Sequence, residues 1–158
     1  MNFSNDNISV QDQYAKDSIC FGCGPANKKG LQIKSFRSSY GLEMLYKCES
    51  HHQAFPGVIN GGIIGALFDC HGNWAAAIAL LDSGKYDDIP STVTASYSVS
   101  LLRPTPFDST LHVKAKVIKM MDNKVEVEMN LFVKDMHLAN GSGLFVAVEE
   151  DHPAFHRW

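Results

Sequence analysis

The sequence predicts an α+β fold in which a long buried helix is wrapped by a curved antiparallel β-sheet of about five to six strands. Two observations predict it. Residues 63–81 carry apolar side chains on every face of a helix, a pattern typical of a helix enclosed by the rest of the protein. Two short strand-like segments precede this helix and four long alternating segments follow it, so one sheet can surround it.

Length and charge narrow the classes of protein to which the chain can belong. Its 158 residues are enough for a proper core, and we interpret 1–158 as a single domain in which residues 1–18 form a tail or a short peripheral helix. The net charge of −3 argues against a general nucleic-acid binder. No apolar signal-peptide core is visible at the N-terminus, so we expect a cytoplasmic protein.

The predicted strands before the helix form a hairpin. Residues 31–36 alternate in polarity as a half-buried strand does, 38–41 read as a turn, and 42–48 form the second strand. Residues 50–57 follow as an irregular segment that ends in a Pro-Gly turn.

The helix has recognisable ends. Asn60 is a good N-cap, because its side-chain oxygen can accept a free N–H of the first turn, and Ser83 with Gly84 ends the helix. The apolar stretch 57–81 is long enough to raise the question of a membrane span. It contains polar residues such as Asn60 and Asp69, and the sequence has no second such segment, so we expect no membrane contact.

The four predicted strands after the helix are long and closely spaced. They cover residues 92–103, 111–121, 124–134 and 138–149, and the short turn at 121–124 makes its neighbours antiparallel. The alternation is strict in the third, where Val125, Val127, Met129, Leu131 and Val133 share one face.

Two further expectations concern packing. Gly141 and Gly143 mark a bulge or a point of close approach in the last strand. A single sheet cannot cover the whole helix, so an apolar flank should remain, and association of copies would bury it.

Asp69 is the residue that most needs an explanation, because a carboxylate in a nearly apolar helix is costly unless something there requires it. Gly61 and Gly62 stand two turns upstream, where the helix start offers bare backbone N–H groups. A carboxylate and an anion-stabilising helix end on one element suggest acyl-transfer chemistry.

The cysteines give a weak metal signal. A zinc site needs a second pair that matches the spacing of the CxxC at 20–23, and the sequence has none, although Cys48 with His51 or His52 could complete a set. We therefore expect reduced, partly buried thiols, no metal and no cofactor. The four cysteines are Cys20, Cys23, Cys48 and Cys70.

Four motifs in order carry a resemblance to a known family. They are CFGCGP at 20–25 with GL at 30–31, HQ at 52–53 with PG at 56–57, NGG at 60–62 followed by Asp69, and TASYSV at 94–99 followed by LRPTP at 102–106. From about residue 20 to 148 the chain resembles the hotdog-fold acyl-CoA thioesterases. Within that family it more closely resembles the phenylacetic-acid-degradation branch, which includes the human THEM-type enzymes.

The resemblance implies a catalytic set. Asp69 matches the family's base or nucleophile, the N–H of Gly61 matches the group that polarises the thioester carbonyl, and Thr94 matches the residue that orients the water. The family site lies between subunits, which implies a homodimer or a dimer of dimers (homotetramer) with Asp69 and Gly61 facing one another across the interface.

The resemblance also implies substrate contacts and includes two departures. We assign Asn60, Gly62 and His52 to substrate binding, and Arg103 to the phosphates of coenzyme A, although Arg103 also fits a solvated basic face. The family usually has His where this chain has Asn60, and many members have Asn or Gln where it has Ala54.

The predicted function is hydrolysis of an acyl-CoA to free acid and coenzyme A. Each site residue has a structural alternative: Asp69 as a buried carboxylate satisfied by backbone donors, the Gly pair as a packing device, and Thr94 as an ordinary strand residue. The first alternative function is a hotdog protein that binds acyl-CoA without hydrolysis, as a sensor or structural subunit. A hydratase on this fold would need a His with an acidic partner at a different spacing. We expect His71 to be a pocket-wall or core residue rather than a base.

Overall fold

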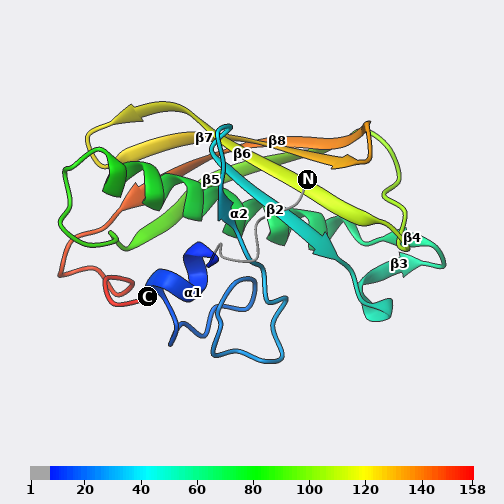
Figure 1. The fold of residues 1–158 in the computed structure, drawn as a ribbon, viewed down its shortest axis with the longest axis horizontal. Helices are drawn as coiled ribbons and strands as arrows, with labels where there is room; N and C mark the ends of the chain where they lie inside the picture. The colour runs from blue at the N-terminus through cyan, green and yellow to red at the C-terminus, as the bar shows by residue number, and fades with distance from the viewer. Residues whose placement is uncertain (1–7) are drawn as a thin grey trace.

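A computed structural model describes residues 8–158 of the chain. Over that range the chain forms a six-stranded antiparallel sheet, a small two-stranded sheet and a long helix, α2, that packs across one face of the larger sheet (Figure 1). The predicted α+β arrangement is therefore confirmed. The elements in order are α1 (Val10–Tyr14), β1 (Phe36–Arg37), β2 (Leu42–Lys47), the 3-10 turn η1 (Ser50–His52), β3 (Gln53–Phe55), β4 (Val58–Ile59), α2 (Gly61–Asp82), β5 (Thr92–Leu101), β6 (Thr110–Met121), β7 (Lys124–Val133) and β8 (Met136–Ala147).

Helix α2 is the core of the molecule, as its all-round apolar pattern predicts. Asn60 caps it by accepting a hydrogen bond from the Gly62 N–H, and the helix ends at Asp82. By length and composition α2 could cross a membrane, but 78% of its most apolar window is buried inside the fold. It is therefore enclosed by the chain's own sheet and loops.

The large sheet has the strand order β1-β2-β6-β7-β8-β5, and β5 lies at one edge. Helix α2 contacts β5, β6, β7 and β8, so the central strands present their apolar faces to it. The predicted alternation is confirmed: the fully buried residues include Leu111, Val113, Ala115, Val125, Val127, Met129 and Leu131. The strands β6, β7 and β8 pair with one another in regular antiparallel register over most of their length.

The expected apolar flank of α2 is largely covered by the chain itself, which corrects the sequence-based picture. The segment before β1 and the C-terminal residues both pack on the side of α2 away from the sheet (Figure 1). Trp74 of α2 is fully buried there, with its ring centroid 4.3 Å from that of Trp158. Ile33 is likewise 0% exposed. A second copy is not needed to bury this face.

Residues 31–36 were predicted as a strand, but only Phe36 and Arg37 are in β1, so this prediction is wrong for most of its length. Gln32 has φ +54°, a left-handed conformation that breaks an extended chain. Its side-chain amide instead donates hydrogen bonds to the carbonyl oxygens of Gly24, at 2.8 Å, and Asn27, at 2.5 Å. The local alternation reflects loop packing rather than strand pairing.

Two smaller predictions also change. Residues 50–57 are not irregular throughout: η1 leads into the β3–β4 hairpin, which turns at Gly57 with φ +86°.

Gly141 is a point of close approach and not a bulge, because a Cβ there would lie 2.3 Å from the Ser98 carbonyl oxygen. The irregularity in pairing between β5 and β8 falls on β5, between Thr94 and Ser96. Within the predicted 1–18 segment, α1 is the short helix, and residues 1–7 lie outside the described range.

Candidate active site

The carboxylate of Asp69 lies on the side of α2 that faces the edge strand β5. Thr94 of β5 donates a hydrogen bond from its hydroxyl to Asp69 Oδ1 at 2.6 Å. Both side chains are half-buried, so the carboxylate is held at one oxygen and still reaches solvent. Within residues 8–158, Asp69 Oδ2 makes no hydrogen bond, which leaves it available to a water molecule or a substrate.

A chain of buried polar side chains supports this contact. The hydroxyl of Thr92 donates to Asn73 Oδ1, Asn73 Nδ2 donates to Thr94 Oγ1 at 3.3 Å, and Thr94 donates to Asp69. Thr92 is 0% and Asn73 is 3% exposed, so two members of the chain are protected from competing water. Every donor points toward the carboxylate, and such an arrangement polarises each hydrogen bond in turn.

The sequence analysis did not assign Thr92 and Asn73. Asn73 lies four residues after Asp69, so both side chains lie on the same face of the helix. Thr92 and Thr94 are two residues apart on β5 and therefore share one face of the strand. These two periodicities together were the signal that could have predicted the pairing.

The start of α2 is the second part of the site. Asn60 Oδ1 accepts the Gly62 N–H at 2.7 Å, so this N–H is already satisfied. The Gly61 N–H makes no hydrogen bond to any residue in 8–158 and lies at the positive end of the helix dipole. A Cβ on Gly61 would approach Leu101 Cδ1 to 2.8 Å, so the absence of a side chain at position 61 lets Leu101 pack closely against the helix start.

His52 supports the helix start from inside the fold. Its backbone carbonyl accepts the Asn60 N–H at 2.9 Å, and its Nδ1 accepts the Glu49 N–H at 3.0 Å. The side chain is 4% exposed, which leaves little surface for contact with a substrate. Burial, together with the neighbouring His51, lowers the pKa of His52, so the neutral ring that accepts the Glu49 N–H is favoured.

Arg103 lies in the loop after β5, and this loop runs beside the start of α2. The Ile59 N–H donates to the Thr105 carbonyl at 2.9 Å, and Val58 pairs with Pro106, which fixes the loop against β4. The Arg103 side chain is exposed and forms no ion pair with residues 8–158. Its charge is therefore free for an anionic partner.

A comparison with known protein families identifies the family of this chain. The family described as the thioesterase superfamily matches residues 56–140, more than half of the chain. The chain belongs to the thioesterase superfamily. The matched stretch contains Asp69, Thr94, Arg103 and the whole start of α2, but neither His52 nor the CFGCGP segment.

Solved structures agree on the hotdog fold of this superfamily member. A thioesterase superfamily protein from Shewanella loihica PV-4 is 27% identical, with a TM-score of 0.68 over 89% of this chain and 100% of that one. A thioesterase from Thermus thermophilus, complexed with coenzyme A and Zn, is 17% identical, with a TM-score of 0.58 over 75% and 87%. A hypothetical thioesterase from Streptococcus pneumoniae TIGR4 with coenzyme A is 14% identical, with a TM-score of 0.62 over 73% and 85%. Among curated proteins, none matches the sequence significantly.

His71 of this superfamily member is a core residue, in agreement with the expectation from the sequence. It is 0% exposed, with Nδ1 2.8 Å from Ser35 Oγ and Nε2 3.2 Å from the Leu42 carbonyl oxygen. The carbonyl can only accept, so Nε2 carries the proton and Nδ1 accepts from the serine. Burial lowers the pKa of His71 to about 4, so the ring is neutral near pH 7.

The thiols of this superfamily member do not gather as the sequence suggests. Cys48 does not complete a set with the CxxC pair; Cys70 of α2 does, and the three sulfur atoms of Cys20, Cys23 and Cys70 lie within 4.8 Å of one another. This cluster was missed because it depends on how the loop before β1 folds over the helix.

Proposed function

We propose that the protein hydrolyses an acyl-CoA thioester to a free carboxylic acid and coenzyme A, with Asp69 as the reacting carboxylate. The hydrogen bond from Thr94 to Asp69 is the observation that carries this proposal. It fixes one carboxylate oxygen and leaves the other open at a half-exposed position, as a general base or a nucleophile requires.

The geometry refines the role of Thr94. Its proton is committed to Asp69 and one of its lone pairs to Asn73, so the hydroxyl acts first as a positioning group for the carboxylate. A remaining lone pair can accept a proton of the attacking water. Thr94 therefore orients both the base and the water that the base activates.

The carbonyl of the thioester would be polarised by the Gly61 N–H. A free N–H at a helix N-terminus suits the oxyanion of a tetrahedral intermediate, and loss of such a donor typically costs about 2.7–4 kcal/mol of barrier. Eight residues separate Gly61 from Asp69, or about 12 Å along a helix axis, so both cannot reach one carbonyl from the same helix. The proposal therefore pairs Asp69 of one chain with Gly61 of a second copy.

The edge strand β5 suits such a pairing in a homodimer or a dimer of dimers. It is ten residues long, carries Thr94, and is the last strand of the sheet, so its outer backbone groups are open to a partner. Tyr97, Leu101 and Leu102 on or just after β5 are 47%, 54% and 50% exposed, and association would bury this apolar surface.

Coenzyme A is the proposed thiol carrier for two reasons. The Thermus thermophilus and Streptococcus pneumoniae proteins of this fold carry coenzyme A in their structures. In this chain the exposed, unpaired Arg103 stands on the loop that flanks the start of α2, and a guanidinium is well suited to phosphate oxygens.

One observation favours a binder that does not hydrolyse its ligand. Asn60 replaces the family's usual His, and its side-chain oxygen is occupied by the Gly62 N–H. A thioester at the helix start would then meet one free backbone donor rather than two. This second candidate keeps the same ligand and the same site but predicts no turnover.

The test is turnover of a panel of acyl-CoA thioesters of different chain length and polarity, with a thiol-trapping reagent as the readout. Hydrolysis of at least one member with a saturable rate is the expected result. Acyl-CoA binding without thiol release across the panel would support the binder. Release only from an acyl carrier protein thioester would show that the carrier assignment is wrong.

A further inference from the structure

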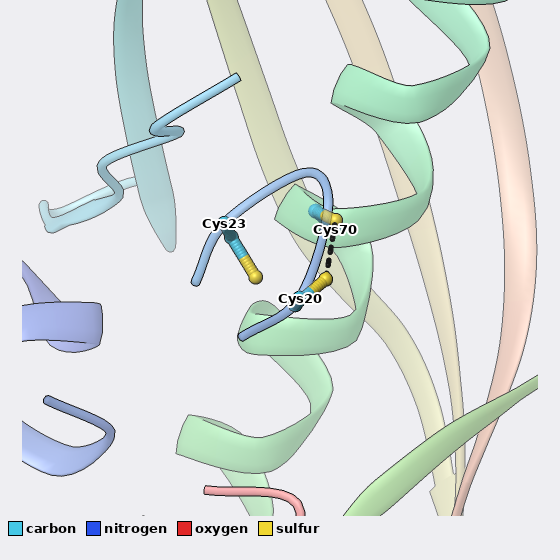
Figure 2. A group of neighbouring side chains, drawn as sticks. All are labelled: Cys20, Cys23 and Cys70. Carbon is cyan, nitrogen blue, oxygen red and sulfur yellow. Dashed lines mark hydrogen bonds between the residues drawn. The ribbon is translucent and has the colours of Figure 1, made fainter. Parts of the chain in front are cut away.

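A different face of α2 from that of Asp69 carries the cluster of three thiols, Cys20, Cys23 and Cys70. Figure 2 shows Cys20 and Cys23 on the loop before β1 and Cys70 on α2, with the sulfur atoms turned toward one another. The sulfur atoms of Cys20 and Cys70 are 3.8 Å apart. Cys23 is 1% and Cys70 is 7% exposed, while Cys20 is half-buried.

We propose that this three-thiol cluster is a binding site for a divalent thiophilic cation, with Zn²⁺ as its occupant. A Zn–S bond is about 2.3 Å long, so two thiolates on a tetrahedral zinc lie about 3.8 Å apart. The Cys20–Cys70 separation equals this value, and the third sulfur lies within 4.8 Å of both. A small rotation of one side chain is enough to complete the set.

The backbone of the loop is shaped around these sulfur atoms. A Cβ at Gly22 would lie 2.3 Å from Cys70 Sγ, so the loop can approach the helix this closely only because position 22 has no side chain. The Gly24 N–H donates to the Cys20 carbonyl at 2.9 Å and closes the turn that brings Cys20 and Cys23 together. The glycines of the CFGCGP motif therefore serve the cluster, a role that the proposed hydrolysis does not use.

One buried N–H group points at the sulfurs, as expected for a thiolate bound to a metal. The Trp74 indole nitrogen donates to Cys23 Sγ at 3.3 Å. Trp74 is 0% exposed, and within residues 8–158 its N–H has no other acceptor. A neutral thiol is a weak acceptor for a buried indole N–H, whereas a metal-bound thiolate is a strong one.

Charge favours a divalent ion over a monovalent one. Three thiolates with Zn²⁺ leave one net negative charge, which the Trp74 indole N–H can help to stabilise, whereas a monovalent ion would leave two. Cys20 is the most exposed of the three ligands, so the fourth position of the metal opens toward solvent and takes a water or a small anion. The ion would fasten the loop before β1 to α2, on a different face of the helix from that of Asp69.

Metal binding is tested on the full chain, purified with a non-thiol reductant and without chelator. We expect one equivalent of zinc by elemental analysis, and one equivalent of Co²⁺ or Cd²⁺ after exchange, with sulfur-to-metal charge-transfer absorption. In the folded protein, added zinc should protect Cys20, the half-buried cysteine of the cluster, from alkylation. A wild-type protein that binds no metal, or an intact mass lowered by two hydrogens despite the reductant, would overturn the proposal.

Four variants sharpen the test, each with its fold checked by circular dichroism. Cys20→Ser, at the most exposed ligand, and Cys70→Ser should lose the charge-transfer band, with a fall in zinc affinity beyond the about 10- to 100-fold typical of an outer-shell loss. Trp74→Phe should keep the stoichiometry and weaken binding about tenfold. The matched control is Cys48→Ser, because Cys48 is buried but outside the cluster. Folded ligand variants that bind zinc as the control does would overturn the proposal.

Discussion

Two faces of α2 use neighbouring residues for opposite purposes. Asp69 and Asn73 point to the edge strand β5, whereas Cys70 and Trp74, one residue further along, point to the loop before β1. Each pair is spaced by four residues, so each forms a column on its own side of the helix. The first column ends in a half-exposed carboxylate, and the second is enclosed by thiols and indole rings.

The two faces of α2 differ in which parts of the chain cover them. The sheet ends at β5, so the carboxylate column has solvent beside it and a free oxygen on Asp69. The thiol column is covered by residues of the same chain, some before α2 in the sequence and some after it. The open side suits the reaction proposed for Asp69, whereas the closed side buries groups that pack against the rest of the fold. One helix can therefore support both without either disturbing the other.

The largest expected effect separates activity from stability on the open face. Asp69→Asn is nearly isosteric and can still accept the Thr94 hydrogen bond, so the free energy of unfolding should change little. The loss of the base or nucleophile should lower kcat/KM for an acyl-CoA by about 10³-fold, within the range for general-base groups. Steady-state kinetics and denaturant unfolding measure the two effects.

The control for that variant is Asp82→Asn, the same substitution at the exposed end of the same helix. Asp82 forms a bidentate ion pair with Arg37, and exposed pairs contribute at most about 1 kcal/mol. We expect unchanged kcat/KM. If Asp69→Asn kept wild-type activity, Asp69 would be a structural carboxylate, and the two faces would not differ in function.

The next effect is on stability and belongs to the enclosed side. Burial lowers the pKa of His71 to about 4, below the ordinary value of 6.5, so between these pH values the unfolded chain binds more protons at this site. His71 therefore contributes its stabilisation fully above about pH 6.5, and that contribution is lost as the pH falls toward 4. The loss at this site should be about 3 kcal/mol.

Urea unfolding of wild type and His71→Gln across this pH window measures the His71 contribution. Other groups titrate in both proteins, so the difference between the two curves isolates His71. The variant is expected to be less stable at pH 7 and to lose less stability on acidification. Parallel curves would mean that His71 is not the group that links acidification to unfolding.

Thr94→Val should give a smaller effect on activity. It keeps the shape of the side chain but removes the hydrogen bond to the carboxylate, and such a bond to a charged group contributes about 1.5–3 kcal/mol. We expect kcat/KM to fall about 10- to 100-fold. Thr94→Ser should restore most of it, and Ser98→Ala, an exposed hydroxyl on the same strand, should have no effect. A drop of equal size in Ser98→Ala would point to damage to β5 rather than to the loss of one hydrogen bond.

The smallest expected effect is that of Thr92→Val. It leaves the buried Asn73 Oδ1 without its donor, which should cost about 1–2 kcal/mol of stability. Because Asn73 can still donate to Thr94, kcat/KM should fall only a few-fold. Thermal unfolding and kinetics on the same preparation check both. An activity loss as large as that of Thr94→Val would mean that the whole hydrogen-bond chain acts as one unit.

The sequence predicts the regular parts of the molecule well because they repeat. Strict alternation over residues 125–133 and the all-round apolar pattern of α2 are long enough to outweigh local exceptions. The β3–β4 hairpin was missed, because strands of two or three residues carry no period. The left-handed Gln32 was missed as well, since nothing in its type signals φ above zero.

Some residues of the candidate site could be predicted from the sequence, and others could not. Asp69 and Thr94 were predicted from their resemblance to family positions, and the structure brings them into contact. The meeting of Cys70 with Cys20 and Cys23 could not be predicted, because it depends on the path of a loop fixed by individual side-chain hydrogen bonds. Whether the four proposed substrate contacts bind a ligand stays a prediction.

The covering of α2 by residues far apart in sequence limits where the chain can be divided. The stretch that matches the superfamily, residues 56–140, leaves out β2, ends within β8 and lacks both Cys23 and Trp158. A fragment cut at those borders would present Trp74 and its neighbours to water, and aggregation would be its expected fate. The stretch that matches the superfamily is therefore shorter than the stretch that must be kept together for expression, recombination or design.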